Sequence, residues 1–126
     1  MRIVIADDSV LMLERLQKML SLIDNVEVLG VYRNGTDALA GLKTFSPDLA
    51  ILDNKMPGLN GVDIIREVRK ENHTIKLMLL TFYSDLIYQK QAMEAGADYF
   101  FSKSDDFEKI PELIDQLKKI DVIRNR

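Results

Sequence analysis

Short apolar runs alternate along this chain with longer segments in which apolar residues recur every three or four positions. The short runs, rich in β-branched or aromatic residues, predict strands at 3–6, 26–32, 49–52, 75–80 and 99–101. The longer segments predict amphipathic helices at 10–23, 36–45, 62–70, 84–95 and from about 110 to 120. The chain is therefore expected to consist of five successive strand–helix units.

Caps and helix breakers set the expected ends of these helices. Asp8 or Ser9 is the natural N-cap of the first helix, and Gly96 ends the fourth. Pro111 suits the first turn of the last helix, so residues 105–109 are expected to form a separate turn. The core-facing residues of the first and last helices are predicted to be Val10, Leu11, Leu13, Leu16, Met19, Leu20 and Ile23, and Leu113, Ile114, Leu117 and Ile120.

The order of the elements predicts an α/β fold. Crossovers of this length imply parallel strands with right-handed connections and helices on both faces of the sheet. Five units fit a doubly wound, five-stranded parallel sheet of flavodoxin-like order 2-1-3-4-5, and they are too few to close a (β/α)₈ barrel. We expect one domain over residues 1–120, followed by a C-terminal tail at 121–126.

The composition of the 126-residue chain narrows the class of protein. With 47% hydrophobic and 29% charged residues it matches an ordinary globular domain, and the net charge of -3 gives no reason to expect a nucleic-acid surface. The chain has no cysteine, which excludes disulfides and thiolate metal sites. Neither a membrane span nor a signal peptide is recognisable, so a cytoplasmic location is the default expectation.

Polar residues stand at the points where the predicted strands end. Asp7 and Asp8 follow the first strand, and Asp53 follows the third. Thr81 ends the fourth strand, and Lys103 comes just after the fifth. Taken singly, each has an ordinary structural explanation, such as a helix cap for Asp8 or a surface position for Lys103. Because the carboxyl ends of parallel strands share one edge of the sheet, we expect these side chains to meet there.

Three carboxylates at one edge of the sheet require a compensating cation. At ~5 Å and an effective dielectric constant of ~20, each pair would repel by roughly 3 kcal/mol. Lys103 supplies one positive charge, which leaves the cluster net negative. The all-oxygen ligands favour Mg²⁺, with Mn²⁺ as an alternative. The lone His73 lies in a polar connection and the chain has no cysteine, which argues against zinc.

A carboxylate beside a divalent ion and an ammonium group can attack a phosphoryl group and become an aspartyl phosphate. Asp53 stands between the acid pair and Thr81, so it is the predicted nucleophile. The metal ion and Lys103 would stabilise the charge that spreads over the equatorial oxygens. The sequence therefore predicts a phosphoryl-transfer site.

Four stretches, in this order and spacing, resemble response-regulator receiver domains of two-component signalling. They are IADDS at 5–9, LDNKMPGLNG at 52–61, LLT at 79–81 and GADYFFSKS at 96–104, and the resemblance extends over the chain from end to end. It implies that Asp7 and Asp8 hold Mg²⁺. It also implies that Asp53, itself a metal ligand, accepts phosphate from a sensor kinase's phosphohistidine, and that the Lys55 carbonyl completes the metal site.

The same resemblance implies how the phosphorylated chain signals. Thr81 and Lys103 would contact the phosphoryl group, and Phe100 falls on the family's aromatic switch position. The donor would be a sensor histidine kinase or a phosphotransfer protein. A downstream protein would bind the face formed by the fourth helix, the fifth strand and the fifth helix, with a phosphorylation-dependent homodimer as an alternative.

The resemblance further implies a signalling phosphoacceptor that assists its own phosphorylation and dephosphorylation, rather than an enzyme. We expect no membrane or nucleic-acid partner for this chain. It shows no output domain, because the residues after Lys118 are too few for a helix-turn-helix. A stand-alone receiver and a part of a longer regulator both stay open.

Three positions depart from the commonest pattern of the family. Ser104 stands where a proline after a cis bond is usual, so the isomer of the Lys103–Ser104 bond is open. Phe82 stands where a small residue usually leaves the phosphoryl group open, and Lys55 is a charged choice beside the site. We expect Phe82 to cover the phosphoryl group and Lys55 to screen its charge, and together they should slow the loss of phosphate.

Three rival functions fit parts of the pattern. A Mg²⁺-dependent phosphatase of the aspartyl-phosphate type usually carries a second acid two residues after the nucleophile, where this chain has Lys55. A degenerate receiver would lack Asp53 or Lys103, and both are present. A flavin-binding module of similar fold would need a phosphate-cradling loop after the first strand, where Asp7 and Asp8 would repel the phosphate.

Overall fold

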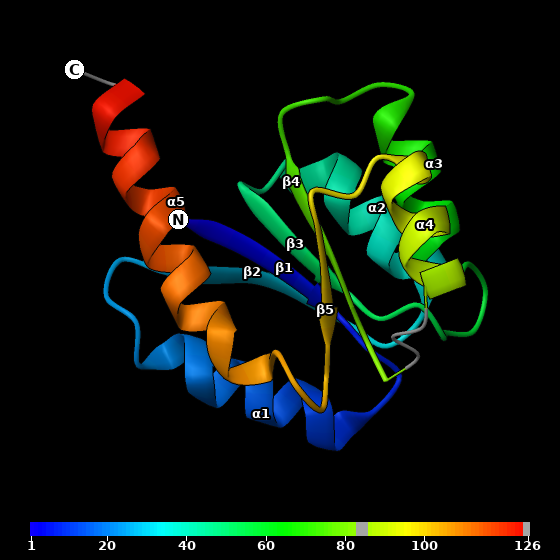
Figure 1. Ribbon diagram of the computed structural model, residues 1–126, viewed down its shortest axis with the longest axis horizontal. Coiled ribbons are helices and arrows are strands. Elements are labelled where there is room, and N and C mark those ends of the chain that lie inside the picture. Colours follow the sequence, from blue (N-terminus) through cyan, green and yellow to red (C-terminus); the bar gives the residue numbers. More distant parts are fainter. Residues whose placement is uncertain (83–85, 125–126) are drawn as a thin grey trace.

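The computed structural model describes residues 1–82 and 86–124, and its strands and helices alternate as the sequence predicts (Figure 1). The strands are β1 (Arg2–Ala6), β2 (Glu27–Tyr32), β3 (Leu49–Leu52), β4 (Lys76–Thr81) and β5 (Tyr99–Ser102). The helices are α1 (Val10–Ser21), α2 (Gly35–Phe45), α3 (Gly61–Arg69), α4 (Leu86–Ala95) and α5 (Ile110–Arg124), and a short 3₁₀ helix, η1 (Phe107–Lys109), precedes α5. The predicted start of the fourth helix, at Ser84, lies outside the described residues.

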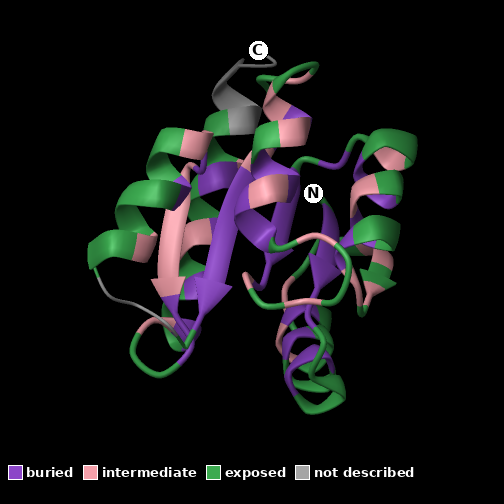
Figure 2. Cartoon of the chain, turned by 90° about the vertical axis from the view of Figure 1, so that its right-hand side faces the viewer, coloured by how far each residue is buried: buried purple, intermediate pink, exposed green. Residues whose placement is uncertain are grey.

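The five strands form one parallel sheet in the order β2-β1-β3-β4-β5, which confirms the predicted flavodoxin-like topology. β3, in the middle of the sheet, is buried at every position. Figure 2 shows the central strands in purple, between helices whose outer faces are green. β5 lies at one edge, and its first three residues are only half-buried. A strand covered on both faces needs apolar side chains pointing both ways, which explains the continuous apolar run of β3.

The two faces of the sheet carry separate hydrophobic clusters. α1 and α5 cover one face, and α2, α3 and α4 cover the other (Figure 1). Along β3, Leu49 and Ile51 pack with the cluster of α1 and α5, whereas Ala50 and Leu52 pack with the cluster of α2, α3 and α4. Because the strand side chains alternate between the two hydrophobic clusters, the strands themselves carry apolar residues. The polar residues therefore come directly after the strands, at the carboxyl edge of the sheet.

Side-chain caps define where the first three helices begin. The Ser9 hydroxyl accepts a hydrogen bond from the Met12 N–H at 3.2 Å, so Ser9, rather than Asp8, is the N-cap of α1. The side chains of Asn34 and Asn60 cap α2 and α3 in the same way, each accepting a hydrogen bond of 2.8 Å. Because Ser9 caps α1, the Asp8 carboxylate is not needed for that purpose.

Part of the predicted core assignment is wrong at the ends of the helices. Val10 and Leu11 are 46% and 68% exposed, and Met12 is buried instead. Val10 and Leu11 lie on the outward side of the first turn of α1, whereas Met12 and Leu13 of the same turn pack in the cluster of α1 and α5. Ile120 is 46% exposed because the last turns of α5 extend past the sheet (Figure 1). α5 itself continues to Arg124, into the segment predicted as a tail.

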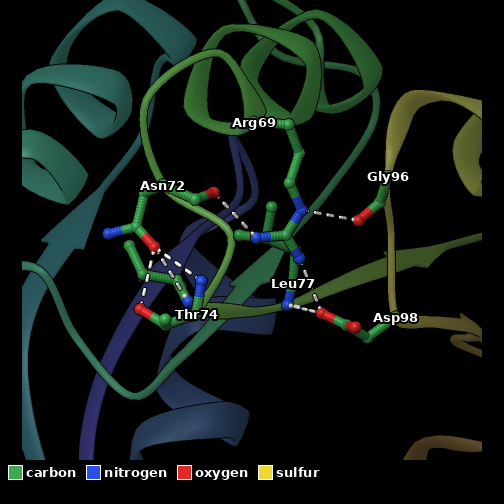
Figure 3. A network of polar contacts seen from close by, with 7 residues as sticks. Arg69, Asn72, Thr74, Leu77, Gly96 and Asp98 are labelled. Atoms are coloured by element: carbon green, nitrogen blue, oxygen red, sulfur yellow. Dashed lines mark hydrogen bonds and ion pairs between the residues drawn. The ribbon is translucent and has the colours of Figure 1, made fainter.

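A single guanidinium group joins four elements at the amino edge of the sheet (Figure 3). Arg69, at the end of α3, donates to the Gly96 carbonyl after α4 at 2.9 Å and to the Asn72 carbonyl at 3.1 Å. It also pairs with Asp98 at 2.8 Å, and the same carboxylate oxygen accepts the Leu77 N–H of β4 at 2.8 Å. Gly96, the predicted end of the fourth helix, has a φ of +115°, and a Cβ there would lie 2.6 Å from the Arg69 side chain. This network fixes the end of α4 opposite the polar edge.

Among the helices of residues 1–82 and 86–124, α5 is the longest with 15 residues, whereas a membrane span needs ~20. Within the described part of the chain, none of the helices has both the length and the apolar character of a membrane span.

Candidate functional site

The carboxyl edge of the sheet brings together the side chains that the sequence singles out. Asp7 follows β1, Asp53 follows β3, Thr81 is the last residue of β4, and Lys103 follows β5. These four residues are buried, with at most 6% of each exposed, whereas the neighbouring Asp8 is exposed. Buried charges persist only when they are paired. The site is therefore a built cluster of charges rather than a chance gathering at the surface.

Lys103 is the cation of this cluster. Its ammonium nitrogen lies 2.6 Å from Oδ2 of Asp7 and 3.4 Å from Oδ2 of Asp53. The other oxygen of Asp7 accepts the Ser9 N–H at 2.9 Å, so the start of α1 orients that carboxylate. The Lys103 N–H donates to the Thr81 carbonyl at 2.9 Å, which extends the pairing of β4 and β5 to the site itself.

Asp53 is held in place by the loop that leads into α3. Its N–H donates to the Ala6 carbonyl at 2.9 Å, just beyond the last register pair of β1 and β3, Ala6 with Leu52. The next residue, Asn54, accepts the Gly61 N–H on its carbonyl at 3.0 Å and the Val62 N–H on its side chain at 3.2 Å. A Cβ on Gly61 would lie 2.5 Å from the Asp53 carbonyl oxygen, so only glycine allows α3 to begin this close to Asp53.

The surroundings of Asp53 change its acidity. Burial, and then the nearby Asp7 carboxylate, raise the pKa of Asp53 from its ordinary 3.8 to about 6, although Lys103 opposes the shift. One ammonium group therefore does not offset the cost of holding two buried carboxylates side by side. The cluster therefore still favours the binding of a further cation.

The three carboxylates are close enough to share one metal ion. Asp7, Asp8 and Asp53 each offer an oxygen, and these oxygens lie within 4.8 Å of one another. A set of hard oxygen donors, one of them on an exposed residue beside solvent, suits Mg²⁺ or Mn²⁺, which keep several water ligands. The donor set present in the chain therefore fits a hard divalent cation.

Two of the sequence departures lie at the rim of the site. The Phe82 side chain is exposed at 62%, and its ring centroid lies 5.1 Å from the Lys103 ammonium. This distance is within the range of a cation–π interaction. Lys55 is also exposed, and its predicted role as a carbonyl ligand stays a prediction. The Lys103–Ser104 peptide bond, whose isomer the sequence left open, is trans.

Phe100 lies on β5, two residues before the end of the strand. Its side chain is partly buried and packs against the hydrophobic cluster of α2, α3 and α4. Its register partner on β4 is Leu79, and the neighbouring pair on the same face is Thr81 with Ser102. The ring therefore stands close to the core on the side of the sheet that α4 covers.

Sequence reasoning missed two features of the structure around Lys103. The ring of Phe82 was expected to cover the site, but its approach to the ammonium group was not foreseen. The second omission is Asp106, whose carboxylate accepts the Ser102 N–H at 2.8 Å beside Lys103. An acid three residues after a predicted site lysine was the only available signal, and it does not reveal which backbone groups face outward.

The chain is similar to known proteins over most of its length. The family model described as the response regulator receiver domain matches residues 3–115. The DNA-binding transcriptional activator EvgA of Escherichia coli is 28% identical over 118 residues, which cover 94% of this chain and 57% of EvgA. The protein-glutamate methylesterase/protein-glutamine glutaminase of Clostridium acetobutylicum is 32% identical over 120 residues, which cover 94% of this chain and 35% of that protein.

Solved structures give the same result. The signal receiver domain of the response regulator NarL from Mycobacterium tuberculosis is 30% identical, with a TM-score of 0.86 over 94% of this chain and 95% of that chain. The likeness to a solved receiver thus extends over nearly the whole chain. Against the two longer relatives above, the chain spans only 57% and 35% of their length.

Proposed function

Because the chain belongs to the response regulator receiver domain family, we propose that Asp53 is its phosphoacceptor and that the charges around Asp53 carry out a metal-dependent phosphoryl transfer. The observation that carries this proposal is the buried cluster at the carboxyl edge. Asp53 stands there within 3.4 Å of an ammonium group and shares a possible metal position with two further carboxylates.

In the proposed reaction an Asp53 carboxylate oxygen attacks the phosphorus of a phosphohistidine. The second ring nitrogen of the phosphohistidine carries a proton. The phosphorus–nitrogen bond breaks, its electron pair leaves with the imidazole, and the retained proton makes the product neutral histidine. The product is an acyl phosphate on Asp53. Lys103 lies where its ammonium group can stabilise the phosphoryl oxygens, and the Thr81 hydroxyl, on the neighbouring strand, can donate a hydrogen bond to them.

Asp7, Asp8 and Asp53, with the carbonyl of Lys55, would hold the Mg²⁺ or Mn²⁺ ion. When bound, the ion supplies positive charge that neutralises the carboxylates and the transferred group. The demand for it follows from the surroundings of Asp53, where burial and Asp7 raise the pKa to about 6. The residues of the chain then have only to position the phosphoryl group and exclude competing charges.

The donor in this proposal is a sensor histidine kinase or a phosphotransfer protein. The surface that transmits the signal is the face of α4, β5 and α5, to which a downstream protein or a second copy of the chain binds. The chain acts as a phosphoacceptor, working as a unit over residues 1–120, and assists only its own phosphorylation and dephosphorylation. The half-buried Tyr99, Phe100 and Phe101 of β5 support this choice of surface.

Intact-mass measurement tests the proposal. The chain is incubated with acetyl phosphate, with Mg²⁺ or with EDTA, beside Asp53→Asn. We expect one phosphoryl group on the wild type with Mg²⁺, and none with EDTA or on Asp53→Asn. A phosphoryl group gained by Asp53→Asn at the wild-type rate would exclude Asp53 as the acceptor.

A further inference from the structure

The turn after β5 is closed by a reciprocal pair of hydrogen bonds. The Ser102 N–H donates to Oδ2 of Asp106 at 2.8 Å, and the Asp106 N–H donates back to the Ser102 carbonyl at 2.8 Å. The Ser102 hydroxyl lies 2.9 Å from the Ser104 hydroxyl and accepts the Asp105 N–H at 3.3 Å. Residues 102–106 are therefore closed into a tight turn, which we call the Asp106 clamp, and Lys103 lies inside it.

The position of β5 explains why the clamp is needed. β5 is an edge strand, and successive backbone groups of a strand point to opposite sides. Lys103 uses its N–H on the β4 side, at the Thr81 carbonyl. The N–H and carbonyl of Ser102 therefore point away from β4, where no strand follows. Ser102 is buried, with 4% exposed, so unpaired backbone groups there would be costly. Asp106 pairs with both of them.

The Asp106 carboxylate stays ionised in this arrangement. The hydrogen bond from the Ser102 N–H, and then the contact with Lys109, hold the pKa of Asp106 below its ordinary value. The Lys109 ammonium donates to Oδ1 at 2.9 Å, so each carboxylate oxygen has its own partner. A charged acceptor makes the stronger hydrogen bond to a backbone N–H.

We propose that Asp106 is a positioning residue for Lys103, because its clamp fixes the backbone from which the lysine side chain reaches the carboxylate cluster. Lys103 is held on one side by β4 and on the other by the clamp, and its ammonium group stands 2.6 Å from Asp7. Residues 102–106 read SKSDD, so no proline restricts the backbone of this turn. Asp106 supplies the constraint through hydrogen bonds. The inference rests on the proposed contact of Lys103 with the phosphoryl group.

Beryllofluoride, which mimics a phosphoryl group, gives the readout that separates positioning from general stability. We expect Asp106→Ala to lower the affinity for beryllofluoride in saturating Mg²⁺ about tenfold, because small displacements of a positioned group are costly. The Mg²⁺ affinity itself should not fall, since Asp106 touches none of the three carboxylates and Lys103 competes with the ion for Asp7. Asp106→Asn keeps one oxygen for the Ser102 N–H and should restore most of the affinity.

Two further variants show whether Asp106 acts through Lys103. In a Lys103→Met background, Asp106→Ala should have no additional effect, as a double-mutant cycle requires of residues that act in series. Asp63→Ala is the matched control, because Asp63 also pairs with a cation three residues later, Arg66 at 3.0 Å, but lies on α3. It should leave both affinities at their wild-type values.

Several results would overturn the inference. The first is an unchanged beryllofluoride affinity in folded Asp106→Ala. The second is a full additional loss of beryllofluoride affinity when Asp106→Ala is added to Lys103→Met. The third is a parallel loss of Mg²⁺ affinity in Asp106→Ala that Asp106→Asn does not restore. If Asp106→Ala does not fold, Asp106→Glu moves the carboxylate by one methylene and is measured in the same way. If the wild type binds no beryllofluoride with Mg²⁺, the proposed function fails. If the wild type binds it and Asp106→Ala binds it with the same affinity, only the positioning role of Asp106 is refuted.

Discussion

The Lys103 ammonium group makes its shorter contact with Asp7, at 2.6 Å, and stands 3.4 Å from Asp53, the proposed acceptor. The lysine therefore compensates the charge of Asp7 more than that of Asp53. This distribution of charge agrees with the raised pKa of Asp53, about 6, because the nearby cation does not offset burial and the second carboxylate. An ion that binds Asp7 would compete with Lys103 for that carboxylate, and the lysine would then be available to the phosphoryl group.

The first prediction concerns the dependence of stability on pH. The pKa of Asp53 is raised in the folded chain from 3.8 to about 6, so folding favours the protonated carboxyl. The contribution of Asp53 to the free energy of unfolding is therefore present below about pH 4 and lost as the pH rises through 6. Asp53→Asn should match the wild type near pH 4 and exceed it by about 2 kcal/mol at pH 7.5 in EDTA. Urea denaturation at the two pH values measures this, and a difference that does not vary with pH would refute it.

The second prediction separates the metal-binding and capping roles of Asp8. Its carboxylate lies within 4.8 Å of those of Asp7 and Asp53, and Ser9 already caps α1. Asp8→Ala should weaken Mg²⁺ binding about tenfold and raise stability in EDTA by up to ~1 kcal/mol, because one repulsive charge is removed. Ser9→Ala is the control: it should lose ~1 kcal/mol of stability and keep its Mg²⁺ affinity. An Asp8→Ala chain that melts lower in EDTA and binds Mg²⁺ normally would make Asp8 a structural residue only.

The third prediction concerns the lifetime of the phosphorylated chain. The Phe82 ring lies over the Lys103 ammonium and is exposed at the rim, where it can hinder an incoming water molecule. Phe82→Ala should lose its phosphoryl group several-fold faster, whereas Phe82→Tyr, which retains an aromatic face, should behave like the wild type. The decay of the phosphorylated mass after removal of the donor gives both rates. A Phe82→Ala lifetime equal to or longer than that of the wild type contradicts shielding.

The fourth prediction concerns Phe100. Its partly buried ring already packs against the cluster beneath α4, and phenylalanine, unlike tyrosine, has no hydroxyl to desolvate. The unphosphorylated chain should therefore populate the inward ring position appreciably, and phosphorylation should shift the population only as far as its differential affinity allows. NMR of the Phe100 ring with and without beryllofluoride measures the populations. A ring that does not respond to the mimic would exclude a switch. An exclusively outward ring in the free chain would exclude a switch that is already partly inward before phosphorylation.

The sequence was sufficient to predict the strands of the sheet and the convergence of the charged residues at its carboxyl edge. Buried parallel strands are short apolar runs, and the polar residues that follow them must share one edge, so Asp7, Asp53 and Lys103 could be brought together without coordinates. The choice between Asp8 and Ser9 as helix cap could not be made, because both residue types cap helices equally well. The exposure of Val10 and Leu11 could not be predicted either, because a run of apolar residues at the start of a helix does not show which of them face the core.

The Asp106 clamp illustrates a second limit of sequence reasoning. It depends on β5 being an edge strand and on which side of that strand Ser102 presents its backbone groups. Strand order and register decide both, and neither follows from the local sequence SKSDD. The contact of Phe82 with Lys103 is equally non-local, because it joins the end of β4 to the end of β5.

The most direct test of the central claim is to locate the phosphorylated residue. After incubation with Mg²⁺ and acetyl phosphate, borohydride reduces an aspartyl phosphate to homoserine, and peptide mass spectrometry then identifies the modified position. We predict homoserine in place of Asp53 alone, and none when EDTA replaces Mg²⁺. Homoserine in place of Asp7 or Asp8, or modification of Asp53 that persists in EDTA, would contradict it.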